Sequence, residues 1–454
     1  MTQTPEEKGQ SHIPTTRISR AATIVGAGAR VGLNYLKYYG QRSITGERGR
    51  DELDRANAGD VYRTLSRLKG GPLKVAQMLS MDQNLLPQAY AAEFSKAQYS
   101  APPLSYPLVA KTFRREFGKD PTEIFDTFTR EAVNGASIGQ VHKATLGRQT
   151  FAVKVQYPGV AQSLKSDLAV AKPLALQLLG LRDSDVSIFF REVEERLLEE
   201  TDYKLELERS IALSQACAGI PDLRFPRYYS EFSSQRILTM DWIEGITLDK
   251  FAASDSSKNL KNRMGQALWN FYDYQIHGLK LFHADPHPGN FLVREGELWA
   301  IDFGCTKKLD DEFYRKNFTL LSSDLLENIP ALESALEELG ILLREDDSAA
   351  REKFLGIFIS TMEVLALPFR RETFDFGNPS FMKAVYELGQ SNSQNEVLRN
   401  MRGRRGSAHS LYVNRTYLGL YSLLSNLRAD ICTPLPNWIR SRDAQRPNLA
   451  APAA

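Results

Sequence analysis

The segment Phe282–Cys305, FHADPHPGNFLVREGELWAIDFGC, concentrates side chains that can handle phosphate groups. Asp285 and Asn290 stand five residues apart, and Asp302 opens an Asp-Phe-Gly triplet twelve residues after Asn290. Mg²⁺ takes oxygen ligands, and proteins usually supply one or two carboxylates for it. We therefore predict Asn290 and Asp302 as metal ligands, and Asp285 as a carboxylate that faces the substrate of a phosphoryl transfer.

The residues between Asn290 and Asp302 predict how these two side chains come together. Apolar residues 291–293 and 298–301 flank a Glu-Gly-Glu turn, which is typical of a hairpin. A hairpin there returns Asp302 to the side of Asn290. The alternative is a polar turn that only caps neighbouring backbone, and the joint occurrence of HxDxxxxN and DFG argues against it. His287 is expected to brace the loop rather than react.

A lysine stands inside the apolar strand pattern FAVKV (151–155) further upstream. Lys154 is costly to bury there unless an anion pairs with it. The charged helix expected around 192–208 offers three acids, Glu200, Asp202 and Glu206. We predict Lys154 as a catalytic residue beside Asp285, and its anionic partner, one of these three acids, as another. The alternative for Glu206 is an ordinary acid on a solvated helix surface.

A loop of small residues, NGASIGQVH (134–142), precedes the lysine strand. Small side chains let backbone amides approach phosphate groups closely. The loop is not a GxGxxG motif. We predict Ala136, Ser137, Ile138 and Gly139 as nucleotide-binding residues, together with Lys154.

Bulk composition narrows the class of protein. The chain has 454 residues, 42% of them apolar, so it is long enough for two or three domains, and its net charge of +2 argues against a nucleic-acid partner. Its three distant cysteines form no CxxC pair and favour a reducing compartment. The first ten residues lack an apolar core, and no apolar run reaches the ~20 residues of a membrane span. We expect a cytoplasmic protein, or a peripheral one at the inner face of the membrane.

Periodicity and chain breaks predict an order of elements that matches a two-lobed, protein-kinase-like α+β fold, and the motifs above carry that assignment. The order is a helical extension, a small α+β lobe and a larger helical lobe. The predicted segments are a disordered tail (1–16), a basic amphipathic segment (17–50), a helical extension (51–128), the small lobe with a helical insert (129–244), the helical lobe (245–432) and a loose tail (433–454).

Two basic stretches of the sequence each have more than one interpretation. Residues 17–50 carry seven Lys and Arg and one acid, Glu47, so this stretch suits an anionic bilayer surface. A helix that packs its apolar stripe on the body of the protein, with its charges solvated, is slightly favoured. The cluster MRGRRG (401–406) is interpreted as a solvated loop rather than a contact with lipid or nucleic acid.

From about residue 68 to 305 the chain resembles the UbiB/AarF family of atypical kinases. ASIGQVH (136–142) matches the family's alanine-rich loop, and VKVQYPGV (153–160) is similar to its lysine strand. HADPHPGN and IDFG match its catalytic and metal motifs, and Glu200-Thr201-Asp202-Tyr203 matches its Glu-x-Asp motif. LKVAQMLS (73–80) resembles the family's Lys-x-Gly-Gln extension.

The resemblance implies how these motifs are used. The extension would pack on the active site, where Lys74, with Gln77 in the same motif, would meet the Glu-x-Asp motif of Glu200 and Asp202. Glu206 would then be left for Lys154. Adenine would contact backbone at the segment 240–243, which contains Asp241 and Ile243.

The same resemblance implies a function. ATP or ADP and Mg²⁺ would be the cofactors, and the activity would be that of a kinase or ATPase. The role would be isoprenoid quinone (ubiquinone) biosynthesis or lipid handling at a membrane, with anionic lipids and quinone-biosynthesis proteins as partners. No Ala-Pro-Glu follows Asp302, which argues against protein-kinase activity.

The chain departs from the family pattern at two places, and two other functions stay open. Ala76 replaces the glycine of Lys-x-Gly-Gln, and Asn134-Gly135 replaces two alanines of the loop. One alternative is a small-molecule kinase of the aminoglycoside/choline type, which has related catalytic motifs but no such extension. The other is a nucleotide-binding pseudokinase that acts as a scaffold.

Overall fold

The computed structural model describes residues 59, 104–136, 138–161, 164, 168–169, 172, 194–195, 198–395, 397–398, 401 and 405–433. The chain divides into two units, one of residues 1–208 and 227–242 and one of residues 209–226 and 243–454. Lys74, Ala76, Gln77 and Ser137 lie outside the described residues, as do the basic segment 17–50 and both predicted tails, apart from Thr433.

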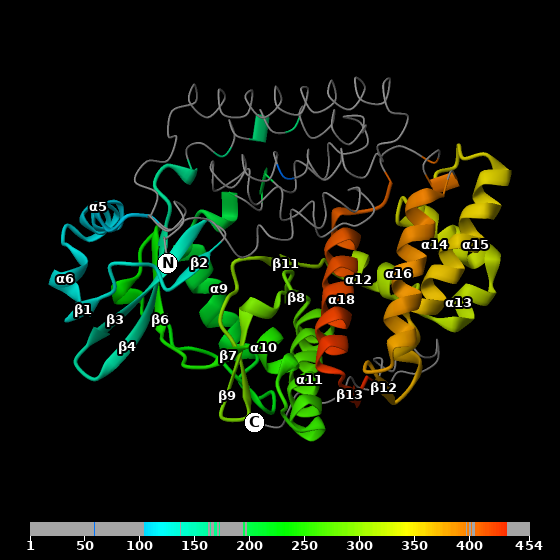
Figure 1. Cartoon of the computed structure of the whole chain (residues 1–454). Coiled ribbons are helices and arrows are strands. Elements are labelled where there is room, and N and C mark those ends of the chain that lie inside the picture. Colours follow the sequence, from blue (N-terminus) through cyan, green and yellow to red (C-terminus); the bar gives the residue numbers. More distant parts are fainter. Residues whose placement is uncertain are drawn as a thin grey trace, which may run out of the picture. The chain divides into compact units, whose positions relative to one another are not determined.

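The first unit is built on an antiparallel sheet (Figure 1). Its strand order is β1-β3-β4-β6, and β2 pairs with β3. β3 and β4 form a hairpin, and β4 contains the predicted lysine strand 151–155. The strands are β1 (Thr127–Phe128), β2 (Asn134–Ala136), β3 (Gly139–Leu146), β4 (Gln149–Gln156) and β6 (Ile237–Asp241).

Aromatic side chains form much of the core of this unit. Phe113 packs edge-on against Phe125 and Phe128. Phe151 of β4 meets Tyr229 in the same way. The helical elements described here are α5 (Tyr106–Phe117), α6 (Pro121–Ile124) and η2 (Ser230–Phe232), and α9 (Tyr203–Ala216) begins in this unit.

The predicted helical extension, residues 51–128, contains a strand at its end. Phe128 of β1 pairs with Ala144 of β3 and is buried, so β1 joins the sheet of the first unit. Residues 104–128 belong to the same unit as the strands that follow them. β1 joins this sheet because the ring of Phe128 packs in the aromatic core of the first unit.

The second unit contains a small mixed sheet in the order β5-β10-β9-β7. β9 (Phe291–Arg294) and β10 (Glu297–Ala300) form the hairpin predicted from the Glu-Gly-Glu turn. β5 (Leu223–Arg224) pairs parallel with β10, which explains why residues 209–226 group here although they were predicted in the smaller lobe. β7 (Ile246–Thr247) completes the sheet.

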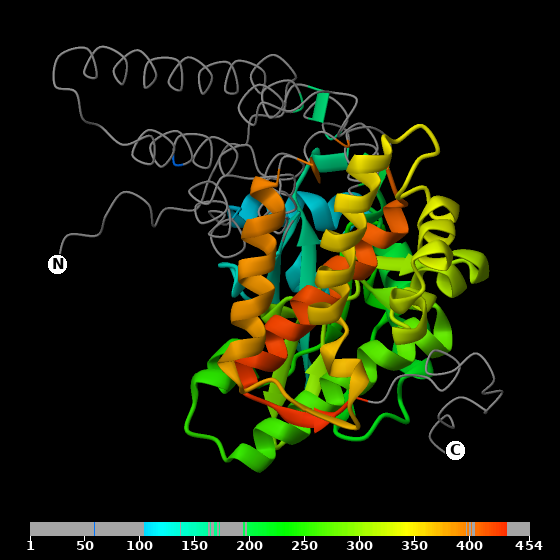
Figure 2. The ribbon, with the colours of Figure 1, turned by 90° about the vertical axis from the view of Figure 1, so that its right-hand side faces the viewer.

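Helices make up most of the second unit, as predicted. α18 contacts α10, α11 and α16, and Figure 2 shows it running beside α16. Side-chain caps set several helix starts, for example Asp310, which accepts from the amide of Phe313 at the start of α12. The helices are α10 (Leu248–Ala253), α11 (Lys258–Asp273), the π-helical η3 (Tyr274–Leu279), η4 (Pro288–Asn290), α12 (Asp311–Thr319), α13 (Ser323–Glu327), α14 (Ile329–Glu338), α15 (Ser348–Leu365), η5 (Leu367–Arg370), α16 (Pro379–Gln394) and α18 (Ala408–Leu427).

Two short strand pairs complete the second unit. β8 (Leu281–His283) pairs with β11 (Thr306–Lys308), and β12 (Thr373–Asp375) pairs with β13 (Asp430–Cys432). Over the part of the chain that is described, no helix combines the length and apolar character needed to cross a membrane.

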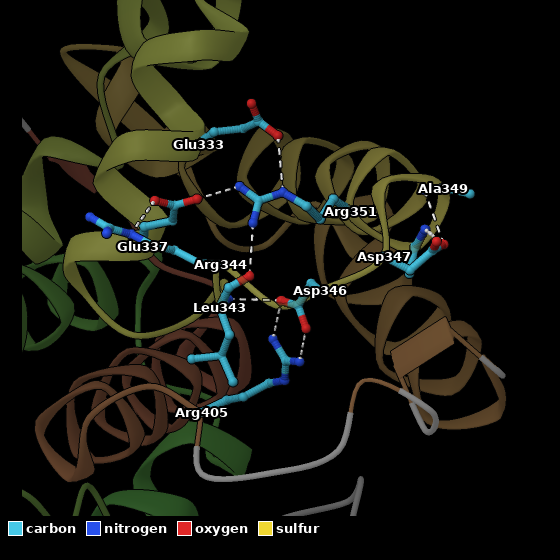
Figure 3. Close-up of polar contacts among 10 residues, drawn as sticks. Glu333, Glu337, Leu343, Arg344, Asp346, Asp347, Ala349, Arg351 and Arg405 are labelled. Carbon is cyan, nitrogen blue, oxygen red and sulfur yellow. Dashed lines mark hydrogen bonds and ion pairs between the residues drawn. The ribbon is translucent and has the colours of Figure 1, made fainter.

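An ion-pair network ties the start of α18 to the loop after α14 (Figure 3). Arg405 donates to Asp346 at 2.7 Å and to the carbonyl of Ile341 at 3.1 Å. Arg351 binds Glu337 and also donates to the carbonyl of Leu343. The interpretation of MRGRRG as a solvated loop is therefore wrong for Arg405, because a buried carboxylate binds it.

Candidate active site

The loop between β8 and β9, residues 284–290, is closed by its own polar groups; we call it the catalytic loop. The amide of His287 donates to the carbonyl of Asp285 at 2.8 Å, and the amide of Asn290 donates to the carbonyl of His287 at 3.0 Å. The ring of His287 accepts from the amide of Gly289 at 3.1 Å. His287 therefore braces the loop, in agreement with the sequence interpretation.

The β9–β10 hairpin brings the second predicted metal ligand back to the catalytic loop. The amide of Ile301 donates to the carbonyl of Asn290 at 3.0 Å, and Asp302 follows directly. The side-chain nitrogen of Asn290 donates to the carbonyl of Asp285 at 2.9 Å. This bond uses the nitrogen of the amide group, and the amide oxygen is the atom that a hard cation would take.

One carboxylate and one amide oxygen suit Mg²⁺. This ion usually keeps several waters and takes its other ligands from substrate phosphates. One oxygen of Asp302 accepts from the amide of Gly304 at 2.9 Å, which orients the carboxylate. The donor set of Asn290 and Asp302 therefore fits the predicted metal, and their role as ligands stays a prediction.

Buried side chains hold the start of the catalytic loop. Gln275, in the π-helical segment η3, accepts from the amide of His283 at 2.9 Å and donates to the carbonyl of Phe271 at 2.9 Å. π-Helical turns are often found near functional sites. The amide of Ala284 donates to the carbonyl of Cys305 at 2.8 Å, which joins this segment to the one after Asp302.

Asp285 has a partner that the sequence did not predict. Nη2 of Arg415, on α18, donates to Oδ1 of Asp285 at 2.8 Å. Burial lowers the pKa of Arg415, but the charge of Asp285, with smaller contributions from Cys305 and Tyr412, outweighs it and the net shift is upward. Arg415 is therefore a half-buried cation beside the predicted catalytic carboxylate.

In the first unit, Lys154 of β4 pairs with Glu206 of α9. Nζ of Lys154 lies 2.7 Å from Oε1 of Glu206, and the two side chains are only 8% and 4% exposed. Nζ also lies 5.2 Å from the centre of the Tyr203 ring. Of the three acids considered, the structure places Glu206 against the lysine, as the resemblance implies; their catalytic role stays a prediction.

The other two acids have different surroundings. Asp202 caps α9, since its Oδ1 accepts from the amide of Lys204 at 3.0 Å and from that of Leu205 at 3.3 Å. Glu200 is buried at 7% exposure. The predicted contact of Glu200 with Lys74 involves a residue outside the described part of the chain.

The loop predicted to cover phosphate groups is the turn between β2 and β3. Ala136 pairs with Gly139, and the side chain of Ile138 is buried; all three stay predicted nucleotide-binding residues. Gly139 packs tightly: a Cβ there would lie 2.5 Å from the carbonyl oxygen of Val155 and 2.7 Å from the Tyr203 hydroxyl. A side chain at position 139 would therefore displace β4.

The predicted adenine-binding segment begins at the end of β6. Asp241 accepts from the hydroxyl of Tyr229 at 2.8 Å and from the amide of Arg227 at 2.9 Å. Its own amide donates to the carbonyl of Arg227 at 2.9 Å, so the carbonyl of Asp241 is the backbone group left for the predicted contact. Ile243 is the first residue of the second unit after this segment. Both stay predicted adenine contacts.

A strand lysine held by a helix glutamate, and a loop carrying Asp285 and Asn290 just before Asp302, define a kinase-like protein. The profile of the ABC1 atypical kinase-like domain matches residues 96–331, and the chain belongs to this family. The family named from the sequence motifs and the two-lobed kinase-like fold are thereby confirmed.

Three of the curated relatives come from an amoeba, a plant and a fish. The probable serine/threonine-protein kinase abkB of Dictyostelium discoideum is 32% identical over 304 residues, which are 63% of this chain and 46% of the relative. A chloroplastic aarF domain-containing protein kinase of Arabidopsis thaliana is 29% identical over 72% of this chain and 47% of its own length. The mitochondrial atypical kinase COQ8B of Danio rerio is 26% identical over 84% of this chain and 62% of its own length. The chain thus spans about half the length of the first curated relatives it matches.

Among solved structures, the complex of Rv3197 with erythromycin from Mycobacterium tuberculosis is similar along most of the chain. The two share 27% identity at a TM-score of 0.58, over 84% of this chain and 95% of that one. Together with the family match, this likeness supports the two-lobed kinase-like fold.

Proposed function

We propose that the protein is an ATP- and Mg²⁺-dependent phosphotransferase or ATPase of the UbiB type. The observation that carries the proposal is the locked catalytic loop, which holds Asp285 and Asn290 one hairpin away from Asp302. A polar turn with only a capping role would not need an amide and two carboxylates at these spacings.

Each residue would have a separate task. Lys154, fixed by Glu206, would bind phosphate oxygens of the nucleotide. Asn290 and Asp302 would hold Mg²⁺, which neutralises charge on the phosphate oxygens when bound. Asp285 would orient the attacking hydroxyl or water and accept its proton.

The cellular role we propose is isoprenoid quinone biosynthesis or lipid handling at an anionic membrane surface. Two features of the sequence support it: the family motifs, and the basic stretch 17–50, which suits anionic headgroups. The absence of Ala-Pro-Glu after Asp302 in the sequence favours a small acceptor or water over a protein acceptor.

ATP hydrolysis by the purified protein with Mg²⁺, with and without anionic liposomes, tests the proposal. We expect hydrolysis that liposomes stimulate and that both Asp285→Asn and Asp302→Asn reduce to a small but measurable residual rate. Intact Mg²⁺-nucleotide binding without hydrolysis under any condition would favour the scaffold instead. Rapid phosphorylation of one small alcohol in an acceptor screen would favour the aminoglycoside/choline type of kinase.

Calorimetry tests the metal site separately from turnover. Asp302→Asn should weaken Mg²⁺-nucleotide binding, because it removes the charged ligand. Asp310→Asn is a matched control, since Asp310 caps α12 and asparagine caps a helix equally well. Unchanged nucleotide affinity in Asp302→Asn would contradict the assignment of this carboxylate to the metal.

A further inference from the structure

α18 carries the partner of the predicted catalytic carboxylate. Nη2 of Arg415 lies 2.8 Å from Oδ1 of Asp285, and the side chains are 14% and 22% exposed. The two residues are 130 positions apart in the chain. A charge-assisted bond of this length fixes one carboxylate oxygen in direction as well as in distance.

The same face of α18 meets the catalytic loop at a second point. Gly419 stands one turn after Arg415, and a Cβ at position 419 would lie 2.3 Å from Cγ of Pro286. The backbone of the helix is therefore pressed against the residue that follows Asp285. One turn of α18 thus contacts two successive residues of the loop.

A third contact lies one turn earlier on this face. Nζ of Lys307, on β11, lies 4.9 Å from the ring centre of Tyr412. Lys307 is buried and follows the Asp-Phe-Gly triplet by three residues. Tyr412, Arg415 and Gly419 therefore place one face of α18 along both segments that carry the predicted chemistry.

Both ends of α18 are anchored. Before its first turn, the amide of Gly406 donates to the carbonyl of Gly340 at 2.7 Å, and Arg405 pairs with Asp346 (Figure 3). After its last turn, the amide of Asp430 donates to the side chain of Asn262 at 3.0 Å, and β13 pairs with β12. A helix held in this way defines the position of Arg415 without depending on a bound ligand.

We propose that Arg415 is a positioning residue that holds the Asp285 carboxylate in the orientation needed to align the attacking group. The inference rests on the proposed phosphoryl transfer. A contact that restrained Asp285 would have to be released before catalysis. Release would require the packing of Gly419 on Pro286 to open, so this packing favours a positioning role for Arg415. A misplacement of about 1 Å in an active site can cost roughly 100-fold in rate.

The test compares Arg415→Gln and Arg415→Lys with the wild-type protein in Mg²⁺-ATP turnover. We expect kcat to fall on the order of 10- to 100-fold in Arg415→Gln, with KM for ATP and Mg²⁺-nucleotide affinity by calorimetry within about 2-fold. Arg415→Lys, which keeps the charge, should recover part of kcat. Retained nucleotide affinity also shows that the variants fold.

Arg236→Gln is the matched control, because Arg236 is another half-buried arginine that pairs with a carboxylate, Glu116 at 3.2 Å, and it belongs neither to α18 nor to its anchors. It should lower the melting temperature and leave kcat unchanged. In the Asp285→Asn background, Arg415→Gln should cause no further loss of kcat, since the group it positions is already disabled.

Three results would overturn the inference. Turnover in Arg415→Gln that equals or exceeds that of the wild type would exclude positioning. A double variant in which the losses of kcat from Arg415→Gln and Asp285→Asn add in full would exclude it too. Each of these leaves the proposed function standing. Absence of turnover in the wild-type protein would instead refute the proposed function. Arg415 would then have no catalytic carboxylate to position.

Discussion

Glu206→Gln should damage both the stability of the first unit and its affinity for nucleotide. The substitution keeps the shape of the side chain and removes the charge that faces Lys154 at 2.7 Å. At this distance and an effective dielectric constant of about 20, the gross attraction is roughly 6 kcal/mol, part of which offsets the desolvation of both groups. Breaking a buried pair on one side usually costs about 3–5 kcal/mol, and we expect a loss in that range for the free energy of unfolding.

A double-mutant cycle isolates the pair. Lys154→Met removes the other charge, and the double variant should lose less than the sum of the single losses, with a coupling on the order of 2 kcal/mol or more by urea unfolding. Nucleotide affinity, measured by calorimetry with Mg²⁺-ATP, should fall in both single variants, because an unfixed or absent lysine cannot hold a phosphate group in place.

The control is a second half-buried ion pair of the same unit. Arg236 and Glu116 lie 3.2 Å apart, with side chains 16% and 12% exposed. Glu116→Gln should lower stability without changing nucleotide affinity. If Glu206→Gln and Glu116→Gln weaken nucleotide binding alike, or neither does, then Lys154 has no special relation to the nucleotide and the assignment of the pair to the site fails.

Two further predictions concern packing and pH. Gly139→Ala should disrupt the β3–β4 hairpin, since a methyl group meets backbone at 2.5 Å, whereas Gly135→Ala, with nothing within 4 Å, should fold normally; equal melting temperatures would contradict this. Burial raises the pKa of Asp273 to about 7 and lowers that of His277 to about 3, so the folded state binds more protons than the unfolded state at Asp273 and fewer at His277. The two effects oppose each other between about pH 4 and 6.5. Nε2 of His277 lies 3.8 Å from Oδ1 of Asp273, so Asp273→Asn also changes the surroundings of His277, and it should make stability rise with pH there relative to the wild type. Urea unfolding at about pH 4.5 and 6.5 checks this, and parallel slopes in the two proteins would refute it.

The sequence predicted the parts of the site that depend on local order. The hairpin between Asn290 and Asp302 follows from a turn flanked by apolar runs, and β9 and β10 form it. A lysine inside an apolar strand requires an anion, and Glu206 lies against Lys154. Such features can be predicted because a few neighbouring residues determine both the strand and the direction of each side chain.

Features that depend on tertiary packing could not be predicted in this way. Residues 209–226 group with the second unit because β5 pairs with β10, a contact between segments more than 70 residues apart. The interpretation of Arg405 as solvated failed because its partner, Asp346, comes from a different loop. A run of arginines shows charge, but it does not show which carboxylate the fold will bring to it.

The contact of Arg415 with Asp285 also depends on tertiary packing, and the sequence did not predict it. In RTYLGLYSLLSNL (415–427) the apolar period predicts a core helix, and Leu420, Leu424 and Leu427 are indeed buried. One signal was present: an arginine and a glycine one turn apart in a helix with a long apolar stripe. A glycine inside a helix costs about 1 kcal/mol relative to alanine, so a close contact is one reason to find it there. Here that contact is Pro286, and the cation one turn earlier consequently faces Asp285.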